Sequence, residues 1–595
     1  MKINITQLPK EKLLFFACSI ITILGALFVR LNGLGDYYLY SDEAWHMVVA
    51  SQKTLAGLID YNFREEIHPP LSTLIWHIML KISDNILWLR SAAYIPAILL
   101  IPSAYILGNL LIGRAAGFAM AVIAAFGMID INPGVVIRAY PMMLLALAWA
   151  GIFLHKYIAN RQRKYLLWYF ILAFASIQLV HSAAFLIVPY GLLLMWNAYK
   201  NKDKNGFLII LFGHLFLVSC LLGYIGILKF FYGYEGSYDY FLIVNNLSAY
   251  LWDVFRIIIM FLREMLPVEI NKISFYIFSL FLISALSFLI IKERLDLLCI
   301  IIAPLACAVI ANYFLIYPFS GIVRNHLYLF IPFLLLFGFV AQKLYEFILK
   351  FVKSEYHFRV TACAVIAIPL MWSVLDFRNS YLKSPGSLEF YTPKQEFNQY
   401  LKYVNALKKN DTVMILEHEM IWHFLYLERD SAKVEYLTEN LGHFKSDNYE
   451  FYFCAFPGRD ANTLRSFYTF EKFSSDLLDE LSKNGRLPSI KNIIYTHIGG
   501  NYSFFGSMLR MGIKLNQNPS MKLTFNGNPN EKNEFDLIQK IITSNQVVPK
   551  IYKKSPSSEI YITILGMTPE FVRENISGKE FINKSEVRKK MVLGK

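Results

Sequence analysis

Apolar segments and short polar connections alternate along the chain as far as residue 376. The apolar segments lack Asp, Glu, Lys and Arg, and most approach the roughly 20 residues that a helix needs to cross a bilayer. The pattern predicts about eleven membrane-spanning helices. They are expected at Leu13–Val29, Ser91–Gly113, Ala115–Ile129, Ala139–Leu154, Tyr165–Val180, Ser182–Ala198, Gly206–Leu228, Ile273–Ile291, Leu297–Phe319, Leu327–Ala341 and Val360–Leu375.

Two further apolar stretches are too short or too interrupted to span. Leu71–Ile82 follows two prolines, and Val254–Leu262 contains Arg256. Both suit helices that lie in the membrane interface. The alternative, in which Leu71–Ile82 is a true span, would invert every later connection and turn the basic Arg161–Lys164 cluster outward.

The chain changes character at residue 377, where long apolar runs give way to a mixture rich in Lys, Glu, Asn and Ser. Short β-like segments alternate with helix-like ones, which favours an α/β domain with a partly parallel sheet. Strands are expected at Thr412–Leu416, Phe451–Phe456, Asn492–Tyr495 and Glu559–Leu565, and helices at Gln395–Leu407 and Phe473–Ser482. The predicted fold is therefore a polytopic α-helical membrane domain over residues 1–376, followed by an α/β domain over residues 377–595.

Composition agrees with this division. Hydrophobic residues make up 56% of the chain and charged residues only 17%, which excludes a disordered chain, a coiled coil and an ordinary cytosolic enzyme. Six cysteines in 595 residues exclude a disulfide scaffold. The net charge of +14 lies in short connections between apolar runs, so it indicates membrane topology and no nucleic-acid partner.

The basic connections alternate with less basic ones. By the positive-inside rule the N-terminus is cytoplasmic, and an odd number of spans puts the C-terminal domain outside. The outward connections then include the long first loop over residues 32–88.

An acidic pair, Asp42 and Glu43, lies in this first loop among aromatic residues. A carboxylate beside apolar surface holds a proton more tightly, which suits a general base. The competing interpretation is a helix start, because Ser41, Asp42 and Glu43 precede an apolar stretch. Spacing alone favours the helix start, and the two interpretations are compatible.

Further along the loop stand Glu66 and His68, followed by two prolines that can begin a helix. His68 suits a proton carrier, a phosphate partner or a metal ligand. A solvated loop histidine is the plainer interpretation.

These motifs together resemble the GT-C superfamily of polytopic glycosyltransferases, in the branch that contains protein O-mannosyltransferases, the aminoarabinose-to-lipid A transferase and bacterial homologues. An acidic pair after the first span and a His-Pro-Pro-Leu further on are typical of that branch. Similar elements follow in order, at Trp88–Arg90, Asn132–Pro141, Val180–Ser182 and Val323–Pro332. Two departures are the residues before Arg138 and Asn325 after Arg324.

The resemblance implies transfer of a sugar from a polyprenyl-phosphate carrier to a lipid, glycan or protein acceptor, with inversion, at the outer face of a bacterial cytoplasmic (inner) membrane. Asp42 would be the general base, and Glu43 would orient it or the acceptor. Arg138 and Arg324 would bind the leaving phosphate, since Arg binds phosphate in a bidentate way. The remaining candidates are His181 for the phosphate, and Glu66, His68, Tyr140 and Arg90 for the site around it.

Other interpretations remain open. Outer arginines can snorkel to lipid headgroups. A ligase or polymerase that uses a diphosphate-linked carrier would also need arginines, whereas a transporter or flippase would place charges deep within its spans. A non-catalytic scaffold is the last alternative. No metal motif stands out, since His418 and His423 are one residue too far apart for a zinc pair on a helix, and a divalent metal has no support.

Overall fold

The computed structural model describes two compact units. The helical unit holds residues 52–234 and 240–379 and the chain before residue 35, and the C-terminal unit holds residues 35–51, 235–239 and 380–595. The described residues are 22–27, 39, 41–65, 68–127, 136–232, 247–265, 272–291, 294–313, 323–349, 394–407, 410–416, 418–438, 441–454, 467–498, 547–555 and 558–575. The predicted span Val360–Leu375 and most of Leu13–Val29 lie outside them.

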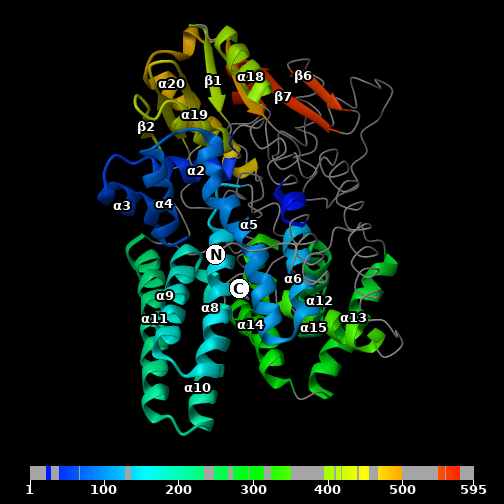
Figure 1. The fold of residues 1–595 in the computed structure, drawn as a ribbon. Coiled ribbons are helices and arrows are strands. Elements are labelled where there is room, and N and C mark those ends of the chain that lie inside the picture. Colours follow the sequence, from blue (N-terminus) through cyan, green and yellow to red (C-terminus); the bar gives the residue numbers. More distant parts are fainter. Residues whose placement is uncertain are drawn as a thin grey trace, which may run out of the picture. The chain divides into compact units, whose positions relative to one another are not determined.

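The described part of the helical unit is made of α-helices and two short 3₁₀ segments. Figure 1 shows α8, α9, α10 and α11 side by side, and neighbouring helices pack antiparallel through short turns. The helices are α3 (Leu55–Glu65), α4 (Pro70–Leu80), α5 (Ile86–Leu111), α6 (Arg114–Phe126), α8 (Tyr140–Asn160), α9 (Arg163–Leu179), α10 (Ala184–Lys200), α11 (Lys204–Tyr232), α12 (Leu247–Glu264), α13 (Lys272–Ile291), α14 (Leu295–Tyr313) and α15 (Phe330–Leu349), with 3₁₀ segments η2 (His181–Ala183) and η4 (Val323–Leu329).

Six helices among the described residues are long and apolar enough to cross a membrane, which indicates an integral membrane protein. They cover Ile86–Leu111, Tyr140–Asn160, His181–Lys200, Lys204–Leu228, Leu295–Tyr313 and His326–Phe347. Three other helices, α6, α9 and α13, also fall on predicted spans.

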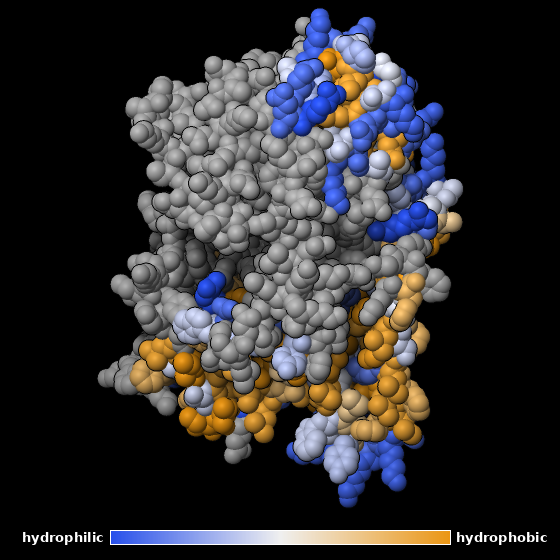
Figure 2. All heavy atoms as spheres, turned by 180° about the vertical axis from the view of Figure 1, so that it is seen from behind, coloured by the Kyte–Doolittle hydropathy of each residue, from blue (hydrophilic) through white to orange (hydrophobic). Residues whose placement is uncertain are grey.

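The surface of the helical unit is hydrophobic, as expected of helices that face lipid. Figure 2 shows hydrophobic residues gathered over these helices, while hydrophilic residues dominate the described surface of the C-terminal unit. Exposed side chains on α11 include Phe212, Phe216 and Leu222.

The two predicted interfacial stretches form helices. The predicted stretch Leu71–Ile82 corresponds to α4. This helix has 11 residues and begins directly after Pro69, with Pro70 in its first turn. At 1.5 Å per residue, a helix of this length covers about half of the hydrocarbon core. Val254–Leu262 lies within α12.

The close contact between α5 and α6 depends on two glycines. A Cβ atom added to Gly117 would lie 2.6 Å from the carbonyl oxygen of Tyr105, and one added to Gly108 would lie 2.9 Å from the Cα atom of Gly117. Because the obstructing atoms belong to the backbone, neither helix has room for a larger residue here. Small residues thus set the spacing of this helix pair.

The C-terminal unit contains a mixed sheet with helices, as the sequence predicted. The described strands are β1 (Thr412–Leu416), β2 (Lys433–Tyr436), β3 (Leu441–Lys445), β4 (Glu450–Cys454), β5 (Asn492–Ile498), β6 (Val547–Ser555) and β7 (Ser558–Met567), in the order β2-β3-β4-β1-β5-β7-β6. Strand β1 pairs in parallel with β4 and β5, and the other pairs are antiparallel. The sheet is therefore partly parallel.

Helices complete this unit: α2 (Ser41–Ala50), α18 (Lys394–Leu407), α19 (His418–Leu427), α20 (Phe467–Lys483) and α23 (Pro569–Asn575), with a 3₁₀ segment η6 (Leu487–Ser489). The buried ring of Phe424 on α19 packs against the sheet, 4.8 Å from Phe451 and 4.9 Å from Tyr449 between ring centroids. Burial of such aromatic side chains stabilises the helix on the sheet.

Candidate functional site

Three predicted site residues from separate connections meet in the helical unit. The Nε2 atom of His68 lies 3.4 Å from the Tyr140 hydroxyl oxygen, and their ring centroids are 5.7 Å apart. The ring of His181 lies 5.7 Å from that of His68. We refer to His68, Tyr140 and His181 as the His–Tyr cluster.

A buried amide holds the backbone of His68. The side chain of Asn62 on α3 donates a hydrogen bond to the His68 carbonyl oxygen at 3.1 Å, and the Thr73 hydroxyl on α4 donates to the Asn62 side-chain oxygen. Asn62 and Thr73 are fully buried. Together with Pro69 and Pro70, they fix the turn that presents the imidazole. Asn62 belongs to none of the motifs recognised in the sequence.

Arg138 and Tyr140 lie together at the start of α8. A backbone hydrogen bond of 2.7 Å from Arg138 N–H to the Val136 carbonyl tightens the turn before the helix, and Pro141 stands in its first turn. Arg138 is only 8% exposed. A snorkelling arginine would leave its guanidinium accessible, so this burial favours a polar role for Arg138.

Arg90 is fully buried on α5. The carbonyl oxygen of its neighbour Leu89 accepts a hydrogen bond from the Trp76 indole at 2.9 Å, which fixes α4 against α5. This contact fixes the backbone next to Arg90, whose side chain lies in the interior of the helical unit.

The segment that contains Arg324 reaches the same region, because η4 packs against η2. The Arg324 side chain lies outside the described residues. His326, two positions later, is fully buried, and its ring lies 6.2 Å from that of Tyr328. The sequence motifs do not predict a role for His326, although it lies within the Val323–Pro332 element.

Asp42 and Glu43 lie in the first turn of α2, which belongs to the C-terminal unit. The helix begins at Ser41, so the helix-start interpretation is confirmed, and acids in a first turn are favoured by the helix dipole. Glu43 is fully buried, which favours a positioning role over direct contact with a solvated acceptor. The Asp42 side chain and Glu66 lie outside the described residues, and convergence of Asp42 with the His–Tyr cluster stays a prediction.

The His-Glu-Met-Ile-Trp-His segment forms the start of α19. His423 is buried, and its Nε2 atom lies 2.9 Å from the carbonyl oxygen of Leu39. Within the described part of the chain, no three His, Cys, Asp or Glu side chains lie close enough together to hold a metal ion.

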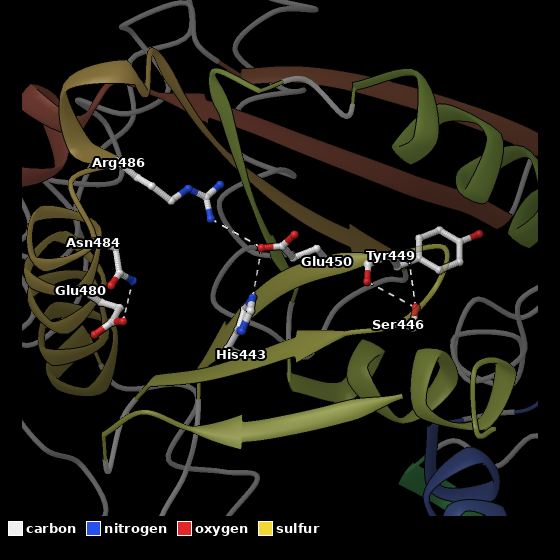
Figure 3. A network of polar contacts seen from close by, with 7 residues as sticks. All are labelled: His443, Ser446, Tyr449, Glu450, Glu480, Asn484 and Arg486. Atoms are coloured by element: carbon white, nitrogen blue, oxygen red, sulfur yellow. Dashed lines mark hydrogen bonds and ion pairs between the residues drawn. The ribbon is translucent and has the colours of Figure 1, made fainter. Parts of the chain in front are cut away.

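A second polar cluster lies on the sheet of the C-terminal unit. Figure 3 shows His443 on β3 and Arg486 after α20 pointing toward Glu450 on β4. One Glu450 oxygen lies 3.3 Å from His443 Nε2 and 3.5 Å from Arg486 Nη1. This cluster ties the β3–β4 hairpin to the end of α20, and its side chains are partly exposed to solvent.

No family model matches the sequence, and no curated protein matches it. Among solved structures, the chain is similar to the Archaeoglobus fulgidus oligosaccharyltransferase in complex with Zn and sulfate (12% identity, TM-score 0.44, 80% of this chain and 67% of that one). It is also similar to AglB of the same archaeon in complex with an inhibitory peptide and a dolichol-phosphate (13%, 0.44, 82% and 69%). A third structure, tethered with an acceptor peptide, gives 12% identity and a TM-score of 0.46 over 80% of this chain and 68% of that one. At these values, nothing about ligands or residue roles passes from those proteins to this chain.

Proposed function

We propose that the protein is an integral membrane glycosyltransferase of GT-C type. It moves a sugar from a polyprenyl-phosphate carrier to a lipid, glycan or protein acceptor at the outer face of the cytoplasmic membrane. The N-terminus is cytoplasmic and the C-terminal unit is extracytoplasmic. Asp42 is the general base, and the attack inverts the anomeric carbon.

The observation that carries this proposal is the His–Tyr cluster. Its three residues come from the turn before α4, the start of α8 and the start of η2, all of which are outward connections by the distribution of basic residues. Residues that meet although they are far apart in sequence are typical of a built site. Arg138 precedes Tyr140 by two residues in the sequence, and its side chain is buried as well.

The chemistry assigns a role to each candidate. Arg138, Arg324 and His181 neutralise the phosphate that leaves the anomeric carbon, because donors aimed at developing charge lower the barrier. Asp42 removes the proton of the acceptor hydroxyl or amine, and Glu43 positions Asp42. Glu66, His68, Tyr140 and Arg90 are the remaining candidates for the site. The apolar surface of the helical unit suits a polyprenyl chain.

The test compares two carboxamide variants from the first loop. Asp42→Asn keeps the shape of the side chain but removes the base, so transfer from a labelled polyprenyl-phosphate sugar in membranes should fall about 10²–10⁴-fold. The matched control is Asp60→Asn. Asp60 forms an exposed ion pair with Arg64 at 3.1 Å, and exposed pairs contribute little, so this variant should keep the wild-type rate. An Asp42→Asn protein that transfers at the wild-type rate contradicts the assignment of the base.

Lipids that co-purify with the protein provide a second test. A transferase of this kind should retain polyprenyl monophosphate, measured by mass spectrometry of the purified protein. Recovery of polyprenyl diphosphate alone would instead support a ligase, a polymerase or a flippase.

A further inference from the structure

The acid-bearing helix α2 is separated from the rest of the C-terminal unit by most of the chain. It nevertheless packs against α19 within that unit, and Leu39, just before α2, contacts His423, 384 positions later. A helix of ten residues is marginal on its own in water, so α2 depends on this packing for its existence.

One hydrogen bond fixes the entry to α2. Because the Leu39 carbonyl oxygen can only accept, His423 must carry its proton on Nε2 and donate it across the 2.9 Å contact. Both residues are buried, so water does not compete for the bond. Leu39 stands three positions before Asp42, so the bond holds the backbone where the acid helix begins.

An aromatic contact fixes the helix itself. Trp45 on α2 and Trp422 on α19 stack with ring centroids 5.6 Å apart and planes inclined by 22°. Stacked pairs of this kind contribute about 0.5–1.5 kcal/mol beyond the area that they bury. The contact lies three residues after Asp42, so Asp42 stands between two points of attachment.

Helix α19, which carries Trp422 and His423, is itself packed against other elements of the C-terminal unit. His423 lies against the buried ring of Phe397 on α18, with centroids 5.7 Å apart, and α18 packs against β5. Helix α19 also packs against β4. The two attachment points are therefore continuous with the centre of the sheet.

We propose that α19 of the C-terminal unit holds the acid-bearing helix in its working position, with His423 and Trp422 as positioning residues for Asp42. The inference rests on the proposed function, because it takes Asp42 as the base. A catalytic side chain must be held within about 0.5 Å of its productive position, and a displacement of about 1 Å can reduce a rate 100-fold. The C-terminal unit thus contributes to the rate of transfer by holding the helix that carries the base.

The test uses the full chain in membranes and in detergent. His423→Leu keeps an apolar side chain against Phe397 but cannot donate to Leu39, whereas His423→Gln retains an N–H donor. The control is His443→Leu in the same unit, since His443 lies against Tyr452 and Glu450 on the sheet. Each protein is measured for kcat and for the KM of a labelled polyprenyl-phosphate sugar. Hydrogen–deuterium exchange of residues 41–50 is measured alongside.

His423→Leu should lower kcat at least about tenfold with the KM of the carrier unchanged, because the base moves while the donor site stays intact. Exchange in residues 41–50 should rise. His423→Gln should recover most of both properties, and His443→Leu should match the wild type in both.

Two outcomes would overturn the inference while leaving the proposed function intact. One is faster exchange in residues 41–50 with a wild-type kcat, and the other is unchanged exchange in His423→Leu. If Asp42→Asn is fully active, the base assignment fails first and the inference falls with it. If His423→Leu does not fold, Trp45→Leu changes the contact from the α2 side and leaves α19 unaltered. The same loss of kcat is then expected, and a wild-type kcat again refutes the inference.

Discussion

At the residue scale, the His–Tyr cluster of the helical unit is held by buried polar side chains that no sequence motif reveals. Asn62 donates to the His68 carbonyl and accepts from Thr73, so it satisfies a backbone group and a hydroxyl together. A buried polar group that loses its partner costs about 1–3 kcal/mol. The orientation of His68 toward Tyr140 therefore depends on Asn62, a residue that belongs to none of the recognised sequence motifs.

This dependence can be measured with Asn62→Leu, which keeps the volume of the side chain and removes both hydrogen bonds. The free energy of unfolding, measured by detergent titration, should fall by about 1–3 kcal/mol. The matched control is Asn201→Ala, since Asn201 is exposed and bonds only to Asn197 of the preceding turn, and its effect should stay within about 0.5 kcal/mol. Equal effects of the two variants would show that the Asn62 bonds contribute little.

At the scale of elements, helix spacing in the membrane is set by small residues. The contact of α5 with α6 leaves no space for a Cβ atom at Gly117, whereas a Cβ atom at Gly223 on α11 would meet no atom within 4 Å. The two glycines therefore form a matched pair, one in a helix contact and one in open space.

We expect Gly117→Ala to lower the free energy of unfolding by about 1–3 kcal/mol, because two backbones must move apart to admit the methyl group. Gly223→Ala should be neutral or stabilising by up to about 1 kcal/mol, since alanine favours the helix. Thermal unfolding of both purified variants in detergent measures the difference. A Gly117→Ala protein as stable as Gly223→Ala would mean that α5 and α6 separate easily.

Two tyrosines, Tyr452 on β4 and Tyr449 just before that strand, are buried enough to affect the stability of the sheet at alkaline pH. Burial raises the pKa of Tyr452 and of Tyr449 above the ordinary value of 10.0, and the nearby Arg486 opposes the shift at Tyr452 in part. The unfolded chain therefore loses these protons at a lower pH than the folded chain. Stability is fully present below about pH 10 and falls as the pH rises toward the folded pKa.

The Tyr449→Phe, Tyr452→Phe double variant tests this sign. Between pH 9 and about pH 11.5 its free energy of unfolding should fall less steeply than that of the wild type, when unfolding is followed by exchange of β4 amides. Parallel pH profiles would show that neither phenol is coupled to folding.

At the scale of the whole molecule, regular apolar patterns were sufficient to predict the main elements. Strands β1, β4, β5 and β7 were predicted because each is an apolar run between polar residues. Strand β6 was missed, since Val547–Ser555 contains a proline and three lysines and forms a strand only by pairing with β7. Strands β2 and β3 were missed because neither is an apolar run, and both form by pairing with a neighbouring strand.

The candidate site was predictable only in part. The distribution of charge predicts that His68, Tyr140 and His181 lie on one side of the membrane. The contact between His68 and Tyr140 depends on how the turn before α4 meets the start of α8, which no local pattern encodes. The sequence pattern also did not predict that α2 belongs to the C-terminal unit. This assignment depends on contacts with Trp422 and His423, more than 370 positions later in the chain.

The attachment of α2 to α19 has a consequence for any shortened form of the protein. A chain cut at residue 379 would keep the membrane helices, but α2 would lose α19, the helix that it packs against, and with it the partner of Trp45. A helix of this length is marginal without its packing partner, so we expect α2 to unfold in the truncated chain. The truncated chain should then lack the proposed transfer activity even where its membrane helices have formed.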